Sequence, residues 1–134
     1  MTSRFVIDAS AVVAITTNRP HRPDLLKRVV LGRATAPEVL DLEVLHALRN
    51  RVHRDEIPVE TARLAVEALP DLPISRVQHR ALIGRVWQLR HSITAYDAAY
   101  VALAEQLDVP LVTCDAKLAR SNGHHAQIEL YPRS

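Results

Sequence analysis

The chain has 134 residues and a mass of 15.0 kDa, which predicts a single domain spanning residues 1–134. Apolar residues make up 48% and charged residues 24%, and 17 basic against 15 acidic side chains give a net charge of +2. This composition excludes a disordered tail, a collagen-like rod and a coiled coil, and a lone cysteine excludes an internal disulfide. No apolar run approaches the ~20 residues of a membrane span, and no signal-peptide core precedes Asp8. We therefore expect a soluble, cytoplasmic protein with no membrane partner.

In chain order, the apolar patterns predict a strand at 5–7, helices at 9–15 and 24–31, a strand at 34–36, helices at 38–53 and 58–69, a strand at 70–74, helices at 76–90 and 94–107, a strand at 109–114, a helix at 116–120 and an edge strand at 127–131. Pro37 suits the first turn of the 38–53 helix. Trp87 falls in the amphipathic run of the 76–90 helix, which predicts that it packs in the core. Short strands alternating with helices indicate an α/β fold with a mainly parallel sheet.

The basic side chains are mostly guanidinium groups, since fifteen of the seventeen are arginine. Arginine suits phosphate, so a nucleic acid is a permitted partner. A genomic composition that favours arginine over lysine explains the same count, and charge alone does not decide between the two. With three glycines, the chain has no glycine-rich phosphate loop.

Two aspartates follow predicted strands directly, Asp8 after 5–7 and Asp115 after 109–114. In open parallel sheets, sites lie beyond the carboxyl ends of the strands, which favours a functional role for both residues. Each also suits the N-cap of the helix that follows it, and position alone leaves the two interpretations open.

Asp97 lies near the start of the 94–107 helix, three residues after a candidate N-cap, Thr94. On a helical wheel it shares the apolar face with Val101 and Ala104. A carboxylate on the face that packs against the sheet is costly without compensation, which implies a partner or a metal ion. The 38–53 helix carries two further acids, Asp41 and Glu43, between which periodicity does not decide.

Taken together, four stretches carry a resemblance: Phe5-Val6-Ile7-Asp8-Ala9-Ser10, Ala36-Pro37 with Glu43, Thr94-Ala95-Tyr96-Asp97-Ala98-Ala99-Tyr100-Val101-Ala102-Leu103-Ala104, and Leu111-Val112-Thr113-Cys114-Asp115. Their order and spacing resemble the PIN-domain ribonucleases, and within them the VapC-type toxins of bacterial type II toxin–antitoxin pairs. The match covers nearly the whole chain.

The resemblance implies a three-layer α/β/α sandwich with a mainly parallel central sheet. It places the family's acidic, metal-binding catalytic site on Asp8, Glu43, Asp97 and Asp115, and thereby selects Glu43 over Asp41. Supporting hydroxyl positions fall on Ser10 and Thr113. One departure is Lys117, which stands where some relatives carry a further acid and leaves the number of metal ions open. The resemblance also implies a homodimer and a small cognate antitoxin.

The acidic set itself argues for a cation. Four carboxylates converging within about 6 Å would repel in six pairs of roughly 2–3 kcal/mol each at an effective dielectric of ~20. The sum, about 15 kcal/mol, rivals the ~5–15 kcal/mol stability of a whole domain. Oxygen ligands favour Mg²⁺ or Mn²⁺, which activate water and stabilise charge on a phosphodiester.

The leading hypothesis is thus a metal-dependent endoribonuclease that acts as the toxin of a toxin–antitoxin pair. A structure-specific DNA nuclease with the same acidic site is an alternative, as is a catalytically silent PIN-like binding domain. A receiver-like signalling module would need an aspartate after its central strand. The predicted strand near Ile74 is followed by Ser75 and Arg76 instead.

Overall fold

The computed structural model describes residues 3–133 and contains one five-stranded sheet in which all neighbouring strands run parallel. The strands are β1 (Ser3–Ile7), β2 (Gly32–Pro37), β3 (Ile74–Val77), β4 (Leu111–Thr113) and β5 (Ile128–Leu130), in the order β3-β2-β1-β4-β5. The first strand is therefore the central one, and Phe5, Val6 and Ile7 are buried. A strand covered on both faces reads as a continuous apolar run, which is why its position was predictable.

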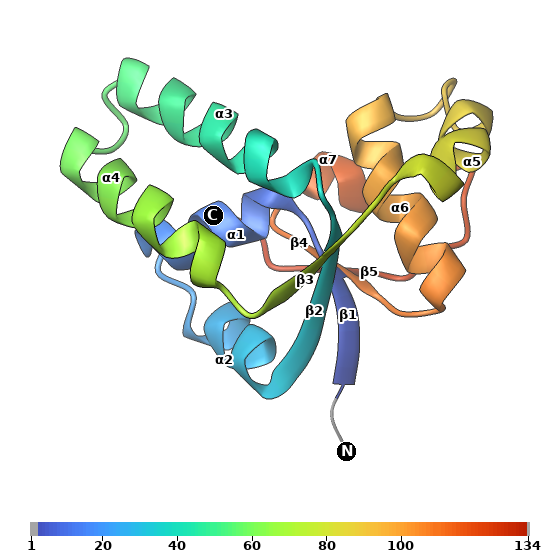
Figure 1. Ribbon diagram of the computed structural model, residues 1–134, viewed down its shortest axis with the longest axis horizontal. Coiled ribbons are helices and arrows are strands. Elements are labelled where there is room, and N and C mark those ends of the chain that lie inside the picture. The colour runs from blue at the N-terminus through green and yellow to red at the C-terminus, as the bar shows by residue number, and fades with distance from the viewer. Residues whose placement is uncertain (1–2, 134) are drawn as a thin grey trace.

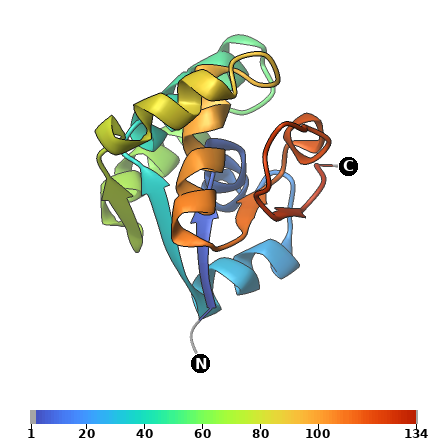
Figure 2. The same ribbon diagram turned by 90° about the vertical axis from the view of Figure 1, so that its right-hand side faces the viewer.

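Seven α-helices cover the sheet in two layers: α1 (Ala9–Thr17), α2 (Pro23–Leu31), α3 (Leu40–His53), α4 (Val59–Ala68), α5 (Ile83–Gln88), α6 (Ala95–Leu107) and α7 (Ala116–Ala119). Figure 1 shows α1 to α4 on one side of the strands and α5 and α6 on the other. The view turned by 90° shows α6 lying across the face of the sheet (Figure 2). This arrangement confirms the predicted α/β/α sandwich. In the described part of the chain, no helix is long and apolar enough to cross a membrane.

One predicted helix is wrong. The 76–90 segment begins in strand β3, continues through a short 3-10 helix, η2 (Arg80–Leu82), and becomes helical only in α5. Val77 pairs with Pro37 of β2, so Pro37 lies in a strand and not in the first turn of α3. Trp87 is 64% exposed, because Leu82, Val86 and Leu89 pack inward and the neighbouring stripe of Ile83 and Trp87 faces outward. The predicted strand at 70–74 is likewise displaced, since a 3-10 turn, η1 (Leu69–Asp71), precedes β3.

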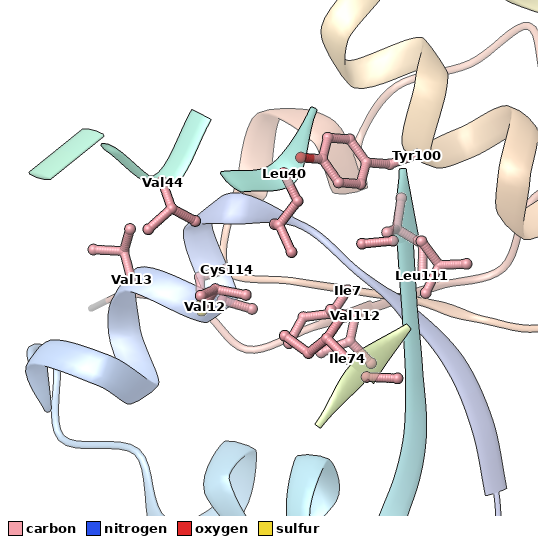
Figure 3. Close-up of a cluster of buried hydrophobic side chains, with 14 of the residues drawn as sticks. Ile7, Val12, Val13, Leu40, Val44, Ile74, Tyr100, Leu111, Val112 and Cys114 are labelled. Atoms are coloured by element: carbon pink, nitrogen blue, oxygen red, sulfur yellow. The ribbon is translucent and has the colours of Figure 1, made fainter. Parts of the chain in front are cut away.

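The buried apolar side chains form a continuous core on the carboxyl half of the sheet. Figure 3 shows Ile7 and Val112 of neighbouring strands packed beside Val12 of α1, with Leu40 of α3 and Tyr100 of α6 above them. Cys114 is buried in the same cluster, and burial raises the pKa of its thiol to about 11, so it is protonated at neutral pH. The helices α1, α3 and α6 thus meet above the carboxyl ends of β1 and β4, at the edge of the sheet where the predicted acids stand.

Candidate active site

Asp8 follows the central strand β1 and is the N-cap of α1, so the structural and the functional interpretation of this residue apply together. Its side chain is buried, and both carboxylate oxygens accept hydrogen bonds. Oδ1 accepts from the Ser10 hydroxyl (2.7 Å) and from the Ala11 amide (3.1 Å), and Oδ2 accepts from the Thr113 hydroxyl (2.6 Å). Burial raises the pKa of Asp8 to about 6, even though the bonds from Thr113 and Ser10 oppose that shift.

Ser10 and Thr113 join the ends of β1 and β4. Their hydroxyl oxygens lie 3.2 Å apart, and each also accepts a backbone N–H, Ser10 from Cys114 (2.9 Å) and Thr113 from Asp115 (3.0 Å). Asp115 is the N-cap of α7 and accepts from the Lys117 amide at 2.9 Å. The two hydroxyls therefore hold Asp8 rigidly and fix the backbone that carries Asp115.

The two acids of α3 have separate partners. Glu43 faces α6, where Oε1 accepts a hydrogen bond from the Tyr100 hydroxyl at 2.5 Å. Asp41 faces the end of β3, where Oδ1 accepts two bonds from the Arg76 guanidinium, at 3.0 and 3.2 Å. Arg76 also bonds backbone carbonyls of Leu69, Leu72 and Ile74. Asp41 thus helps to anchor an edge strand, and Glu43 is the acid turned toward the site.

Asp97 lies in the first turn of α6, and its amide donates to the predicted N-cap, the Thr94 hydroxyl (3.2 Å). The side chain is half-buried. Burial and the charge of Asp115 both raise the pKa of Asp97, while a hydrogen bond from the Thr94 side chain and the Lys117 ammonium oppose them.

Asp97 is the electrostatic centre of the acidic set. Burial is the main cause that raises the pKa of Asp8 and of Glu43, and the charge of Asp97 raises both values further. The charge of Asp115 likewise raises the pKa of Asp97. Asp97 therefore repels each of the other three acids at one edge of the sheet. In the described part of the chain, however, no three His, Cys, Asp or Glu side chains come close enough to hold one metal ion directly.

This spacing suits a strongly hydrated ion. Mg²⁺ keeps several of its waters and uses only one or two carboxylates as direct ligands, so a wide ring of carboxylates fits it better than a cation that needs a tight cage. The donor set is entirely oxygen. The residues present thus fit a hydrated divalent ion of the Mg²⁺ or Mn²⁺ class.

Tyr100 has a role that the sequence analysis did not assign. It is 1% exposed, and its ring reaches from α6 to the start of α3, beside Leu40 (Figure 3). Its place three residues after Asp97, on the same face of a helix, is the signal that points to it.

Comparison with known proteins places this geometry in a family. The family model described as "PIN domain" matches residues 5–123. The chain belongs to the PIN-domain family. Among curated PIN relatives, it is 46% identical over 127 residues to "Ribonuclease VapC1" of Mycobacterium tuberculosis, covering 93% of this chain and 96% of the relative. It is 41% identical over 126 residues to "Ribonuclease VapC12" of the same organism, covering 94% and 98%.

Solved structures show the same PIN fold at lower sequence identity. VapBC2 from Rickettsia felis, solved bound to a DNA fragment from its promoter, superimposes with a TM-score of 0.68 and 12% identity, covering 95% of this chain and 98% of the other. PAE2754 from Pyrobaculum aerophilum gives a TM-score of 0.63 and 20% identity over 89% and 86%.

Proposed function

We propose that this PIN domain is a metal-dependent endoribonuclease and the toxin of a toxin–antitoxin pair. The main support for the proposal is the set of four carboxylates at the carboxyl edge of the sheet, of which Asp97 repels each of the other three. The curated relatives named ribonuclease VapC support the reaction class. The solved VapBC2 complex supports an antitoxin as partner.

A bound Mg²⁺ or Mn²⁺ would activate a water molecule and neutralise charge on the phosphodiester under attack. Asp8, Glu43, Asp97 and Asp115 are the residues that would hold it. Two of them are oriented by side-chain contacts: Asp8 by Ser10 and Thr113, and Glu43 by Tyr100. These fixed orientations limit the reorganisation that ion and substrate binding require, and preorganisation of this kind lowers the barrier of the chemical step.

Two apolar surfaces suit the protein partners. One groove lies between α3 and α4 and includes Leu45, Val59 and Val66. The other lies between α5 and α6 and includes Ile83, Trp87 and Tyr96, of which the side chains are 58–64% exposed. Exposed apolar patches of this kind mark protein interaction sites. We propose that a second copy of the chain and the antitoxin use these surfaces.

The test is incubation of the purified protein with total cellular RNA, with Mn²⁺ and with EDTA, beside Asp8→Asn as the matched variant. We expect cleavage only by the wild type with Mn²⁺, because Asp8 contributes charge and not apolar packing. Cleavage of DNA but not RNA would favour the DNA nuclease alternative, and equal activity of Asp8→Asn would contradict the site. Binding of RNA without any cleavage would indicate a silent binding domain.

A further inference from the structure

A second group of charged side chains lies beside the acidic site and has no role in the proposed chemistry. Arg51 stands in the last turn of α3, Arg54 directly follows that helix, and Arg133 lies in the C-terminal segment. Among residues 3–133, none of the three guanidinium groups is within ion-pair distance of a carboxylate. Other arginines of the chain, such as Arg28, Arg76 and Arg85, have carboxylate partners.

These arginines line a cavity that continues into the acidic site. It has a volume of about 300 Å³, and its walls include Arg51, Arg54 and Arg133 together with Ser10 and Glu43. Ser10 bonds to Asp8, and Glu43 is one of the four acids. A molecule in this cavity therefore touches the acidic site on one side and the arginines on the other.

The C-terminal segment is held in place by contacts with the same part of the sheet. The amide of Tyr131 donates to the backbone oxygen of Thr113 at 2.8 Å, next to the hydroxyl that fixes Asp8. The Arg22 guanidinium bonds the carbonyl of Pro132 and lies 5.7 Å from the centroid of the Tyr131 ring. These contacts place Arg133 at the wall of the cavity opposite α3.

Within residues 3–133, the arginines of this cavity form no direct ion pair. Arg51 is half-buried, and its only side-chain hydrogen bond within the described chain goes to the carbonyl of Arg19 at 3.1 Å. Burial lowers the pKa of Arg51, repulsion from the nearby charge of Arg133 lowers it further, and the charge of Glu56 opposes both effects. An anion between them would relieve this repulsion, and a phosphate oxygen pair matches the fork of a guanidinium.

We propose that Arg51, Arg54 and Arg133 bind a phosphodiester of the RNA strand next to the one that is cleaved. This inference rests on the proposed function and adds the direction in which the strand leaves the acidic site, along α3 toward the C-terminal segment. Phosphate contacts carry no sequence information but set the register of a strand on a protein. The arginine cavity thus positions the backbone, so that one phosphodiester is presented to the acids.

The test uses the two exposed arginines, so that folding is preserved. Arg54→Ala/Arg133→Ala removes two charges from the cavity. The matched control, Arg4→Ala/Arg33→Ala, removes two charges from paired positions on β1 and β2 at the opposite edge of the sheet. Binding of a fluorescent, unstructured RNA oligonucleotide is measured in EDTA by anisotropy at several salt concentrations, and thermal melting verifies that both variants fold.

We expect the cavity variant to bind RNA at least fivefold more weakly than the wild type at low salt, and the control variant to stay within twofold. Loss of one to two phosphate contacts should reduce the salt dependence, the slope of log K against log salt, by about 0.7–1.4. Equal weakening in both variants would mean that net charge alone attracts RNA. That result, or no weakening in either variant, would overturn the inference.

Cleavage of the same oligonucleotide with Mn²⁺ separates this inference from the proposed function. If the wild type cleaves the RNA and the cavity variant has unchanged RNA binding and KM, the inference is wrong and the proposed nuclease activity is supported. If the wild type does not cleave the RNA and only the cavity variant loses RNA binding, the proposed nuclease activity is wrong and the phosphate site is supported.

Discussion

The hydroxyl of Tyr100 donates a hydrogen bond to Oε1 of Glu43 across 2.5 Å, and so connects α6 to α3, two helices that cover opposite faces of the sheet. The bond spans 57 residues of sequence. Burial raises the pKa of Glu43, and the Tyr100 bond opposes that shift, so the phenol favours the ionised carboxylate. Tyr100 is therefore a positioning residue for the acidic site.

Tyr100→Phe should lower cleavage roughly tenfold and raise the Mn²⁺ concentration needed for half-maximal activity, because Glu43 loses the donor that orients it. A hydrogen bond to a charged group contributes about 1.5–3 kcal/mol, which sets that scale. The ring remains buried, so the fold is retained. Titration of activity with Mn²⁺ checks this, and an unchanged titration curve would show that Glu43 needs no such support.

Glu43→Gln and Asp41→Asn form a matched pair on one helix. Glu43→Gln should abolish cleavage, since this acid faces Tyr100 and the site. Asp41→Asn should remain active, but its free energy of unfolding should be lower by about 1 kcal/mol. The reason is that the half-exposed carboxylate of Asp41 binds Arg76 in the wild type. Cleavage assays and urea denaturation of both variants test the assignment, which the reverse pattern of activities would contradict.

Asp97→Asn should stabilise the metal-free protein. Burial and the charge of Asp115 both disfavour the ionised form of Asp97, and asparagine removes that cost. We expect the melting temperature in EDTA to rise by about 2–4 °C, which corresponds to ~0.5–1 kcal/mol for a domain of this size. Mn²⁺ should then raise the melting temperature of the wild type more than that of the variant. Equal metal-induced shifts would argue against Asp97 as a ligand.

Glu105 of α6 should make a contribution to stability that is lost in acid, at a position away from the acidic site. Its side chain is 6% exposed and accepts bonds from Arg85 at 2.8 and 2.9 Å and from the His125 amide at 3.0 Å. The bond from Arg85 is the main cause that lowers the pKa of Glu105 from 4.5 to about 2. A folded-state pKa below the unfolded one stabilises the protein at pH values above 4.5, and that stabilisation is lost as pH falls toward 2.

The matching experiment is urea denaturation of Glu105→Gln at pH 7 and at pH 3. At pH 7 the free energy of unfolding of the variant should be lower than that of the wild type by about 2 kcal/mol, because wild-type Glu105 is then ionised and paired with Arg85. The difference should shrink at pH 3 as the wild type begins to lose the same contribution. Glu67→Gln, at an exposed position of α4, serves as the control and should change little at either pH. A difference that grows at pH 3 would refute the linkage.

Much of the fold was predictable because local signals agree with the tertiary structure. The apolar run 5–7 and the Thr94 N-cap both mark elements that the structure contains, β1 and α6. The 76–90 segment misled because the spacing of Leu82, Val86 and Leu89 is helical while the residues before them pair with β2. Nothing local distinguishes a short edge strand from the first turn of an amphipathic helix.

The candidate site was predictable where it depends on strand ends and not where it depends on distant partners. Asp8 and Asp115 follow strands, and the rule for parallel sheets favours them as site residues, although it leaves an N-cap role open. The choice between Asp41 and Glu43 depends on Arg76 and Tyr100, which lie 35 and 57 residues away. The arginine cavity likewise lies between α3 and the C-terminal segment. Because these segments are far apart in the sequence, no local motif predicts the cavity.

The bond from Thr113 to Asp8 joins residues 105 positions apart, because the first strand of the chain pairs with the fourth. A product of interrupted translation that stops before β4 therefore contains Asp8, Ser10 and Glu43 but lacks Thr113 and Asp115. Proteolysis between α6 and β4 would sever the two halves of the site in the same way. For a protein with the proposed activity, harm to the host cell then requires a nearly full-length chain, and incomplete synthesis or early degradation yields fragments without a complete site.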